Sequence, residues 1–204
     1  MVTELLITIA CIAVLAAIFL PALARSKARS SRLNCANCLK QIGLAFRCWS
    51  LDNNNRLPMQ VTVANGGTME LVASGAVYPH FQVMSNELST PKVLLCPNDQ
   101  KRHYATNFGA DLTDQKLSYF VNVDSASDDG AGLLSGDRNI TNRARPISAL
   151  VSLTRGDTIA WTKEMHVEKG HLGFGDGRVE AFNNGSVAAA INFGEGKTNR
   201  LAVP

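Results

Sequence analysis

An apolar stretch at the start of the chain sets the strongest limit on how the protein can fold. Glu4 is the only charged residue among the first 24, and the 19 residues from Leu5 to Leu23 are almost wholly apolar. A helix needs about 20 apolar residues to cross the roughly 30 Å hydrocarbon core of a bilayer. A helix that is apolar on all sides does not sit on the surface of a water-soluble core. The stretch therefore predicts a membrane span, a cleaved secretory signal or a fully buried helix.

Local features of this stretch bear on those three interpretations. Residues 22–24 read Ala-Leu-Ala, which fits a signal-peptide cleavage motif, but no Lys or Arg precedes the apolar run as a secretory signal requires. The length of the run disfavours a core helix, and a plain single-span anchor stays open on hydropathy alone. Glu4 and Pro21 stand out, because an acid in an apolar setting needs a positive partner and because proline removes a helical hydrogen bond.

One long helix is predicted to continue beyond the apolar stretch. No turn signal occurs before Asp52-Asn53-Asn54-Asn55, and a helix from about Val2 to Leu51 would be about 75 Å long. Its second half is amphipathic, with an apolar stripe at three- and four-residue spacing formed by Cys35, Cys38, Leu39, Ile42, Ala45, Phe46 and Trp49. The opposite face carries Arg32, Lys40, Gln41 and Arg47.

The segment from Glu4 to Leu23 resembles the mature start of type IV pilins and type II secretion pseudopilins. Its sequence E-L-L-I-T-I-A-C-I-A-V-L-A-A-I-F-L-P-A-L stands where that family has E-L-L-x-x-x-A-I-I-x-I-L-A-A-x-x-x-P-A-L. The resemblance implies that Glu4 and Pro21 act in filament assembly. It departs from the family in lacking a basic leader that ends in Gly and in having Met1 near the usual Phe. We interpret the chain as a processed or nearly complete mature form.

Two further segments resemble a prepilin-like branch of this family. Residues 35–45 match its C-x-x-N-L-K-Q-I-G-L-A stem, except that Cys38 replaces Asn. His166 is followed, after nine residues, by Asp176-Gly177, which is similar to the H-x9-D-G signature of the branch. We predict that this signature is a hairpin turn pinned by a hydrogen bond from His166. Metal binding by His166 with Asp176 is the alternative. Catalysis is not indicated, because the sequence shows no nucleophile-base pair beside the signature.

Four cysteines outside the apolar stretch suggest a disulfide in an oxidising compartment. Cys48 is ten residues from Cys38 and further from Cys35, which is about 15 Å or more along a helix and too far for a bond. Cys96 is therefore the predicted partner of a stem cysteine, with Cys35, Cys38 and Cys48 open as candidates and a free Cys96 as the alternative. The family resemblance favours Cys35, since its stem cysteine and its C-P-x-D cysteine both match.

The rest of the chain predicts a loop-rich head with short strands. Apolar runs at 61–63, 93–95, 119–123 and 150–153 are bounded by turn residues, and 171–174 with 179–182 form a predicted hairpin around an Asp176-Gly177 type I′ turn. Ser186 is expected to cap a short helix over 187–192, stopped by Gly194. Asp124, Asp128 and Asp129 offer hard oxygen ligands, so Ca²⁺ is the one candidate cofactor, although EF-hand spacing is absent.

Together these features predict an α+β, pilin-like lollipop with a long N-terminal helix packed on a small antiparallel sheet with long loops. Its parts are residues 1–24 (transmembrane or filament core), 25–55 (amphipathic half) and 56–204 (head). A net charge of +3 and 6% aromatic residues argue against specific nucleic-acid binding. Four basic residues follow the span and favour a cytoplasmic head, whereas the family topology and the cysteines place it outside.

The expected function is a non-enzymatic filament subunit. Its partners would be copies of itself in a helical homopolymer, the bacterial inner membrane before assembly, and the pilus or secretion assembly machinery. The filament would be periplasmic or extracellular. The alternatives are a minor pseudopilin that primes or caps such a filament, and a single-span membrane-anchored periplasmic binding protein.

Overall fold

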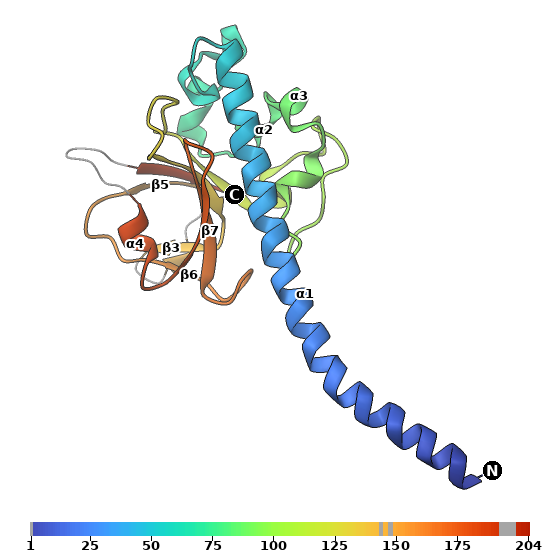
Figure 1. Ribbon diagram of the computed structural model, residues 1–204. Helices are drawn as coiled ribbons and strands as arrows, with labels where there is room; N and C mark the ends of the chain where they lie inside the picture. The colour runs from blue at the N-terminus through green and yellow to red at the C-terminus, as the bar shows by residue number, and fades with distance from the viewer. Residues whose placement is uncertain (1, 143–144, 147–148, 192–198) are drawn as a thin grey trace.

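A single long helix and a β-rich head make up the molecule. The computed structural model describes residues 2–142, 145–146, 149–191 and 199–204. Helix α1 (Val2–Asp52) is continuous for 51 residues, as the sequence predicts. Its N-terminal part stands clear of the head, and its C-terminal part lies against it (Figure 1). The predicted α+β lollipop arrangement is therefore present.

The amphipathic half of α1 packs on the head through the predicted stripe. Cys35, Leu39, Ile42 and Phe46 are each no more than 1% exposed, while Cys38 is half-buried at the side of the stripe. The helix ends where the Asn run begins. Asn54 and Asn55 have φ values of 55° and 54°, the left-handed geometry that Asn tolerates. The side-chain amide of Asn53 donates to the carbonyl of Trp49 at 2.8 Å, which satisfies one terminal acceptor.

Short helices fill the segment between α1 and the sheet. The two α-helices are α2 (Tyr78–Gln82) and α3 (Ser85–Leu88); the 3₁₀ turns are η1 (Pro58–Gln60), η2 (Val63–Asn65), η3 (Met69–Ser74), η4 (Pro91–Leu94) and η5 (Asp114–Lys116). The predictions of strands at 61–63 and 93–95 are therefore wrong. Residue 63 begins η2, and residues 93 and 94 lie in η4. Pro58 starts η1 just before the first run and Pro91 starts η4, because proline fixes φ and needs no donor at a helix start.

Six strands form an antiparallel sheet in the order β5-β9-β1-β2-β7-β8 within the described residues. Their bounds are β1 (Tyr119–Asn122), β2 (Leu133–Asp137), β5 (Ala149–Leu153), β7 (Lys169–Phe174), β8 (Val179–Asn183) and β9 (Asn199–Val203). A second sheet, ordered β4-β3-β6, contains β3 (Ile140–Asn142), β4 (Arg145–Pro146) and β6 (Ile159–Trp161). The strands predicted at 119–123 and 150–153 and the hairpin are confirmed.

The central strands of the six-stranded sheet are buried on both faces, whereas the edge strands β5 and β8 are partly exposed. Tyr119 and Val121 of β1 point into a core shared with α1, whereas Phe120 points into a second core with Trp161 of the small sheet. Alternate side chains of a strand face opposite ways, so one strand serves both cores. Strand β1 is buried along its whole length and pairs with β2 and β9. The head is thus layered as helix, sheet and small sheet, with the strands on one side of α1 in Figure 1.

The β7–β8 turn and the last helix differ in detail from the predictions. The N–H of Gly177 donates to the carbonyl of Phe174, and Phe174 N–H donates to Arg178. Gly177 has a φ of 87° and Asp176 does not have a positive φ, so the turn is a type I turn with a glycine bulge, and the type I′ prediction is wrong. Helix α4 (Val187–Ala190) follows Ser186, whose hydroxyl bonds Asn183 and does not cap the helix. Positions 192 and 194 of the predicted helix lie outside the described residues.

Candidate functional site

The N-terminal half of α1 presents an apolar surface on every side. Residues Val2–Leu23 are long and apolar enough to cross a membrane, and none of this segment is buried in the chain. The large apolar side chains are each at least 54% exposed: Val2, Leu5, Leu6, Ile7, Ile9, Ile12, Val14, Leu15, Ile18, Phe19, Leu20 and Leu23. Removing such a side chain from water contributes about 1.5–3 kcal/mol. The segment therefore needs lipid or other protein chains around it.

Glu4 and Pro21 lie near the two ends of this apolar segment. Glu4 is in the first turn of α1, where a negative charge interacts favourably with the helix dipole. The hydroxyl of Thr8 donates to the carbonyls of Glu4 and Leu5 at 3.0 and 2.8 Å, so this polar group is satisfied within the helix. Pro21 lies inside the helix, and the single chain stays α-helical through it. Loosening at Pro21 on assembly stays a prediction.

A disulfide joins the stem to the head between Cys35 and Cys96, the pair that the family resemblance favours. Their Cα atoms are 5.1 Å apart, and the bond closes a separation of 61 residues. Such a loop contributes about 4 kcal/mol in the chain-entropy model. Cys11, Cys38 and Cys48 are free thiols. Cys48 faces solvent, as expected from its place beside the apolar stripe.

Beside this disulfide, two histidines converge on one carboxylate. Asp137 ends β2 and His171 lies on the adjacent strand β7. Asp137 Oδ2 accepts from the backbone N–H of His171 at 2.7 Å and lies 2.9 Å from His171 Nδ1 and 3.5 Å from His166 Nε2. The two rings meet edge to face with centroids 5.1 Å apart. All three side chains are buried. We call these three residues the His-Asp cluster.

His166 links this cluster to the disulfide and to the loop after it. Its Nε2 is 3.5 Å from Cys96 Sγ, and its Nδ1 is 3.2 Å from the side-chain nitrogen of Asn98. Burial lowers the pKa of His166, although the charge of Asp137 opposes this, so the ring is neutral at neutral pH. Burial also raises the pKa of the neighbouring Cys38 thiol, and the charge of Asp137 adds to this while a hydrogen bond with Tyr119 opposes it. Cys38 is therefore a protonated thiol and not a reactive thiolate.

The predicted roles of His166 in the signature are both corrected by this geometry. Strand β7 lies between His166 and Asp176, and its six residues span about 20 Å. His166 therefore neither pins the β7–β8 turn nor shares a metal with Asp176. The turn is held instead from the stem, where Arg47 donates to the backbone carbonyl of Asp176 at 3.4 Å. The nine residues between His166 and Asp176 correspond to strand β7 and the few residues on either side of it.

A second charged network lies next to the His-Asp cluster. Arg138 donates to both oxygens of Asp99, at 2.6 and 2.7 Å, and to Glu164 at 3.1 Å. Burial would raise the pKa of Asp99, but the hydrogen bonds and charge of Arg138, with a hydrogen bond from Ser118, lower it overall. Arg102 packs beside this pair, and burial together with the charge of Arg138 lowers its pKa to about 10. The network fixes the loop that carries Asp99 against β2.

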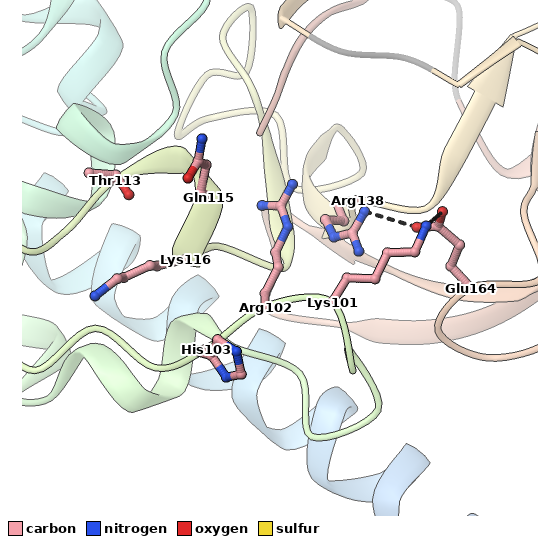
Figure 2. A pocket seen from close by; sticks show the side chains of 8 residues that line it. All are labelled: Lys101, Arg102, His103, Thr113, Gln115, Lys116, Arg138 and Glu164. Atoms are coloured by element: carbon pink, nitrogen blue, oxygen red, sulfur yellow. Dashed lines mark hydrogen bonds and ion pairs between the residues drawn. The ribbon is translucent and has the colours of Figure 1, made fainter.

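A basic pocket opens beside this network. It has a volume of about 440 Å³ and is lined by Lys101, Arg102, His103, Thr113, Gln115, Lys116, Arg138 and Glu164. Figure 2 shows Lys101 and Arg138 meeting Glu164 at one side, while Lys116 lies at the other. Lys116 pairs with Asp111. Several cationic ends thus face one space, although acids already neutralise much of their charge.

The three acids that the sequence offers to Ca²⁺ are not gathered into one group of ligand atoms in the described part of the chain. Asp124 binds Arg200, with Oδ1 2.9 Å from Nε and 2.7 Å from Nη2. Among the described residues, the groups close enough to share a metal ion include neither Asp124 nor Asp128 nor Asp129. The prediction of a Ca²⁺ site there is not supported by this geometry. Asp124 instead anchors β9 to the loop after β1, because its Oδ2 also accepts from the backbone N–H of Arg200.

Comparisons with protein-family models, with curated proteins and with solved structures found no match. Function is therefore inferred from the residues and geometry of the chain itself.

Proposed function

We propose that the chain is a structural subunit that polymerises through α1 into an extracellular type IV pilus-like or type II secretion pseudopilus filament. The observation that carries this proposal is the apolar surface of Val2–Leu23, of which nothing is buried within the chain. The resemblance of residues 4–23 to pilin N-termini names the assembly that such a surface would serve. Before assembly the same surface would hold the subunit in the bacterial inner membrane.

The two halves of α1 suit a subunit that moves from lipid into a bundle. The first half can exchange lipid tails for the helices of other subunits, since both are apolar neighbours. The second half is committed to the head by the buried stripe and by the Cys35–Cys96 bond. A helical array of such subunits would place the apolar halves at its centre and the heads outside. The partners would be further copies of the chain and the machinery that extracts them from the membrane.

Glu4 would set the axial register of this array. Packing other helices around the first turn would take its carboxylate out of water, where an ionised acid is stable only beside a cation. The N-terminal amine of an adjacent subunit would supply that cation. We expect Glu4→Ala to leave the membrane-bound monomer folded and to abolish or sharply reduce filaments, as counted by negative-stain microscopy of the native material.

Two variants control this experiment. Glu4→Gln keeps the size of the side chain and removes its charge, so it should reduce filament formation as strongly as Glu4→Ala does. Glu180→Ala removes a half-exposed acid of the head that pairs with Arg178, and it should assemble normally. Recovery of the Cys35–Cys96 peptide from each variant checks the head. Normal filament yield from Glu4→Ala would remove Glu4 from the mechanism, and fibres that contain only a few copies would indicate a minor, capping subunit.

The basic pocket favours a second candidate function, a single-span membrane-anchored periplasmic binding protein. A space of about 440 Å³ is large enough for a small ligand, and Lys101, Arg102 and Lys116 would favour an anionic one. Under this alternative, the native protein would stay in the membrane fraction without fibres. Micrographs of wild-type material expressed with its assembly machinery therefore separate the two functions.

A further inference from the structure

We propose that Asp137, His166 and His171 bind a zinc ion inside the head. The proposal does not depend on filament assembly. Two imidazoles and one carboxylate are ligands that Zn²⁺ takes in proteins, commonly in a tetrahedral arrangement with a fourth ligand such as water. The three residues come from β2, from the turn before β7 and from β7 itself, so one ion would tie these segments together.

The distances between the ligand atoms fit such an ion. Tetrahedral zinc with bonds of about 2.0–2.1 Å places its ligand atoms about 3.3 Å apart. Asp137 Oδ2 lies 2.9 Å from His171 Nδ1 and 3.5 Å from His166 Nε2, which brackets that value. One ligand atom from each residue lies within 4.8 Å of the others. A small inward rotation of the two rings would therefore complete three of the four positions.

An unsatisfied oxygen gives an independent indication of a missing ligand. Asp137 is fully buried, and its Oδ1 has no hydrogen-bond partner among the described atoms. A buried carboxylate oxygen without a partner is costly, and a metal ion, directly or through a bound water, would satisfy it. If Asp137 only held β2 to β7, the contacts of its Oδ2 with the backbone N–H and the ring of His171 would be sufficient. The second oxygen remains for the ion, as a second contact or through bound water.

The surroundings supply the outer shell that a zinc-bound histidine requires. Asn98 lies 3.2 Å from His166 Nδ1, and with its amide turned the Oδ1 atom would accept the proton of that nitrogen. This hydrogen bond would direct the lone pair of His166 Nε2 toward Asp137. Arg138, which directly follows Asp137, is already paired with Asp99 and Glu164. The charge of Arg32 on α1 also acts on His166. His171 retains 7% exposure, which gives the ion a route to the cluster.

Co²⁺ is the probe for this site, because tetrahedral Co²⁺ absorbs visible light and occupies zinc sites. The full chain is purified in detergent with its disulfide intact, treated with a chelator, and titrated. We expect visible bands that saturate at one Co²⁺ per chain and disappear when Zn²⁺ is added. His166→Gln, His171→Gln and Asp137→Asn should each weaken binding by at least about tenfold. His103→Gln and Asp124→Asn, which change a histidine and an acid outside the cluster, should bind like wild type.

Two results would overturn the proposal: wild-type chain without saturable bands, or cluster variants that bind Co²⁺ as tightly as wild type. A measurement on unaltered protein covers the case in which the variants fail to fold. X-ray absorption of the zinc-loaded wild type should show two imidazoles and oxygen around the metal. Sulfur in the first shell, or fewer than two imidazoles, would contradict the assignment.

Discussion

Acidification from pH 7 to pH 4 is expected to destabilise the head through His80. This residue lies in α2 and is completely buried, with Nδ1 2.7 Å from the hydroxyl of Thr68. Its Nε2 has no hydrogen-bond partner among the described atoms. Burial lowers the pKa of His80 from 6.5 to about 4. The folded head therefore holds this ring in the neutral form over a pH range in which an unfolded chain would protonate it.

The sign and size of the effect follow from proton linkage. Between pH 6.5 and about 4 the unfolded chain binds a proton at His80 that the folded chain does not, so the free energy of unfolding falls as pH falls. The contribution is complete above pH 6.5 and is lost as pH drops through this window. The difference between the two pKa values corresponds to about 3 kcal/mol. Burial lowers the pKa of His166 in the same direction, so the wild type loses more than His80 alone explains.

Urea unfolding in a non-ionic detergent, followed by the fluorescence of buried Trp49 and Trp161, measures this effect. His80→Asn offers an amide oxygen to Thr68 where the ring offers Nδ1, but it does not titrate. We expect its unfolding free energy to fall between pH 7 and pH 4 by about 3 kcal/mol less than that of wild type. His103→Asn, an exposed histidine variant, should follow wild type. Parallel curves for His80→Asn and wild type would refute the reasoning.

Three further predictions concern the stem and the charged network. Peptide mapping without reduction should recover Cys35 joined to Cys96. Reduction of the bond should lower the free energy of unfolding, measured with urea, by about 4 kcal/mol. A free Cys96, or one joined to Cys48, would contradict this. Arg138→Lys should destabilise the head by about 1.5–3 kcal/mol in the same assay, because Lys cannot donate to both oxygens of Asp99. In a filament the helix should loosen at Pro21 to a rise of about 3 Å per residue. Continuous helical density over residues 16–25 would show a simple kink instead.

The long helix could be predicted because its signals are local. Apolar spacing determines where α1 packs, and the Asn run at 53–55 determines where it ends. Strand β2 was not predicted, since two of its five residues, Gly136 and Asp137, are of types that disfavour strands. Packing explains the glycine, because a Cβ on Gly136 would lie 2.7 Å from the ring of Phe120. Pairing with β1 and β7 on either side makes this sequence a central strand.

The His-Asp cluster could not be predicted either, because it depends on the pairing of strands that are distant in sequence. Asp137 belongs to the unpredicted strand, and only the β2–β7 register brings it to His171. The H-x9-D-G signature singles out His166 together with Asp176, but β7 separates the two residues and places Asp176 at the opposite end of the strand. A bond between Cys96 and a stem cysteine was within reach of sequence reasoning, because helix geometry keeps Cys48 from bonding either Cys35 or Cys38. The three-dimensional neighbours of His166 follow from strand order, and residue spacing does not encode strand order.

The position of the disulfide has a mechanical consequence. Among the α1 residues whose side chains the structure describes, Cys35 is the first that is fully buried, so the covalent bond lies where the helix meets the head. Tension applied to the N-terminal half of the helix would reach this bond before it reached Leu39, Ile42 or Phe46. Peeling of the helix from the head would have to begin at the crosslink, which does not yield to forces that separate packed side chains. A pulled subunit would therefore keep its head attached.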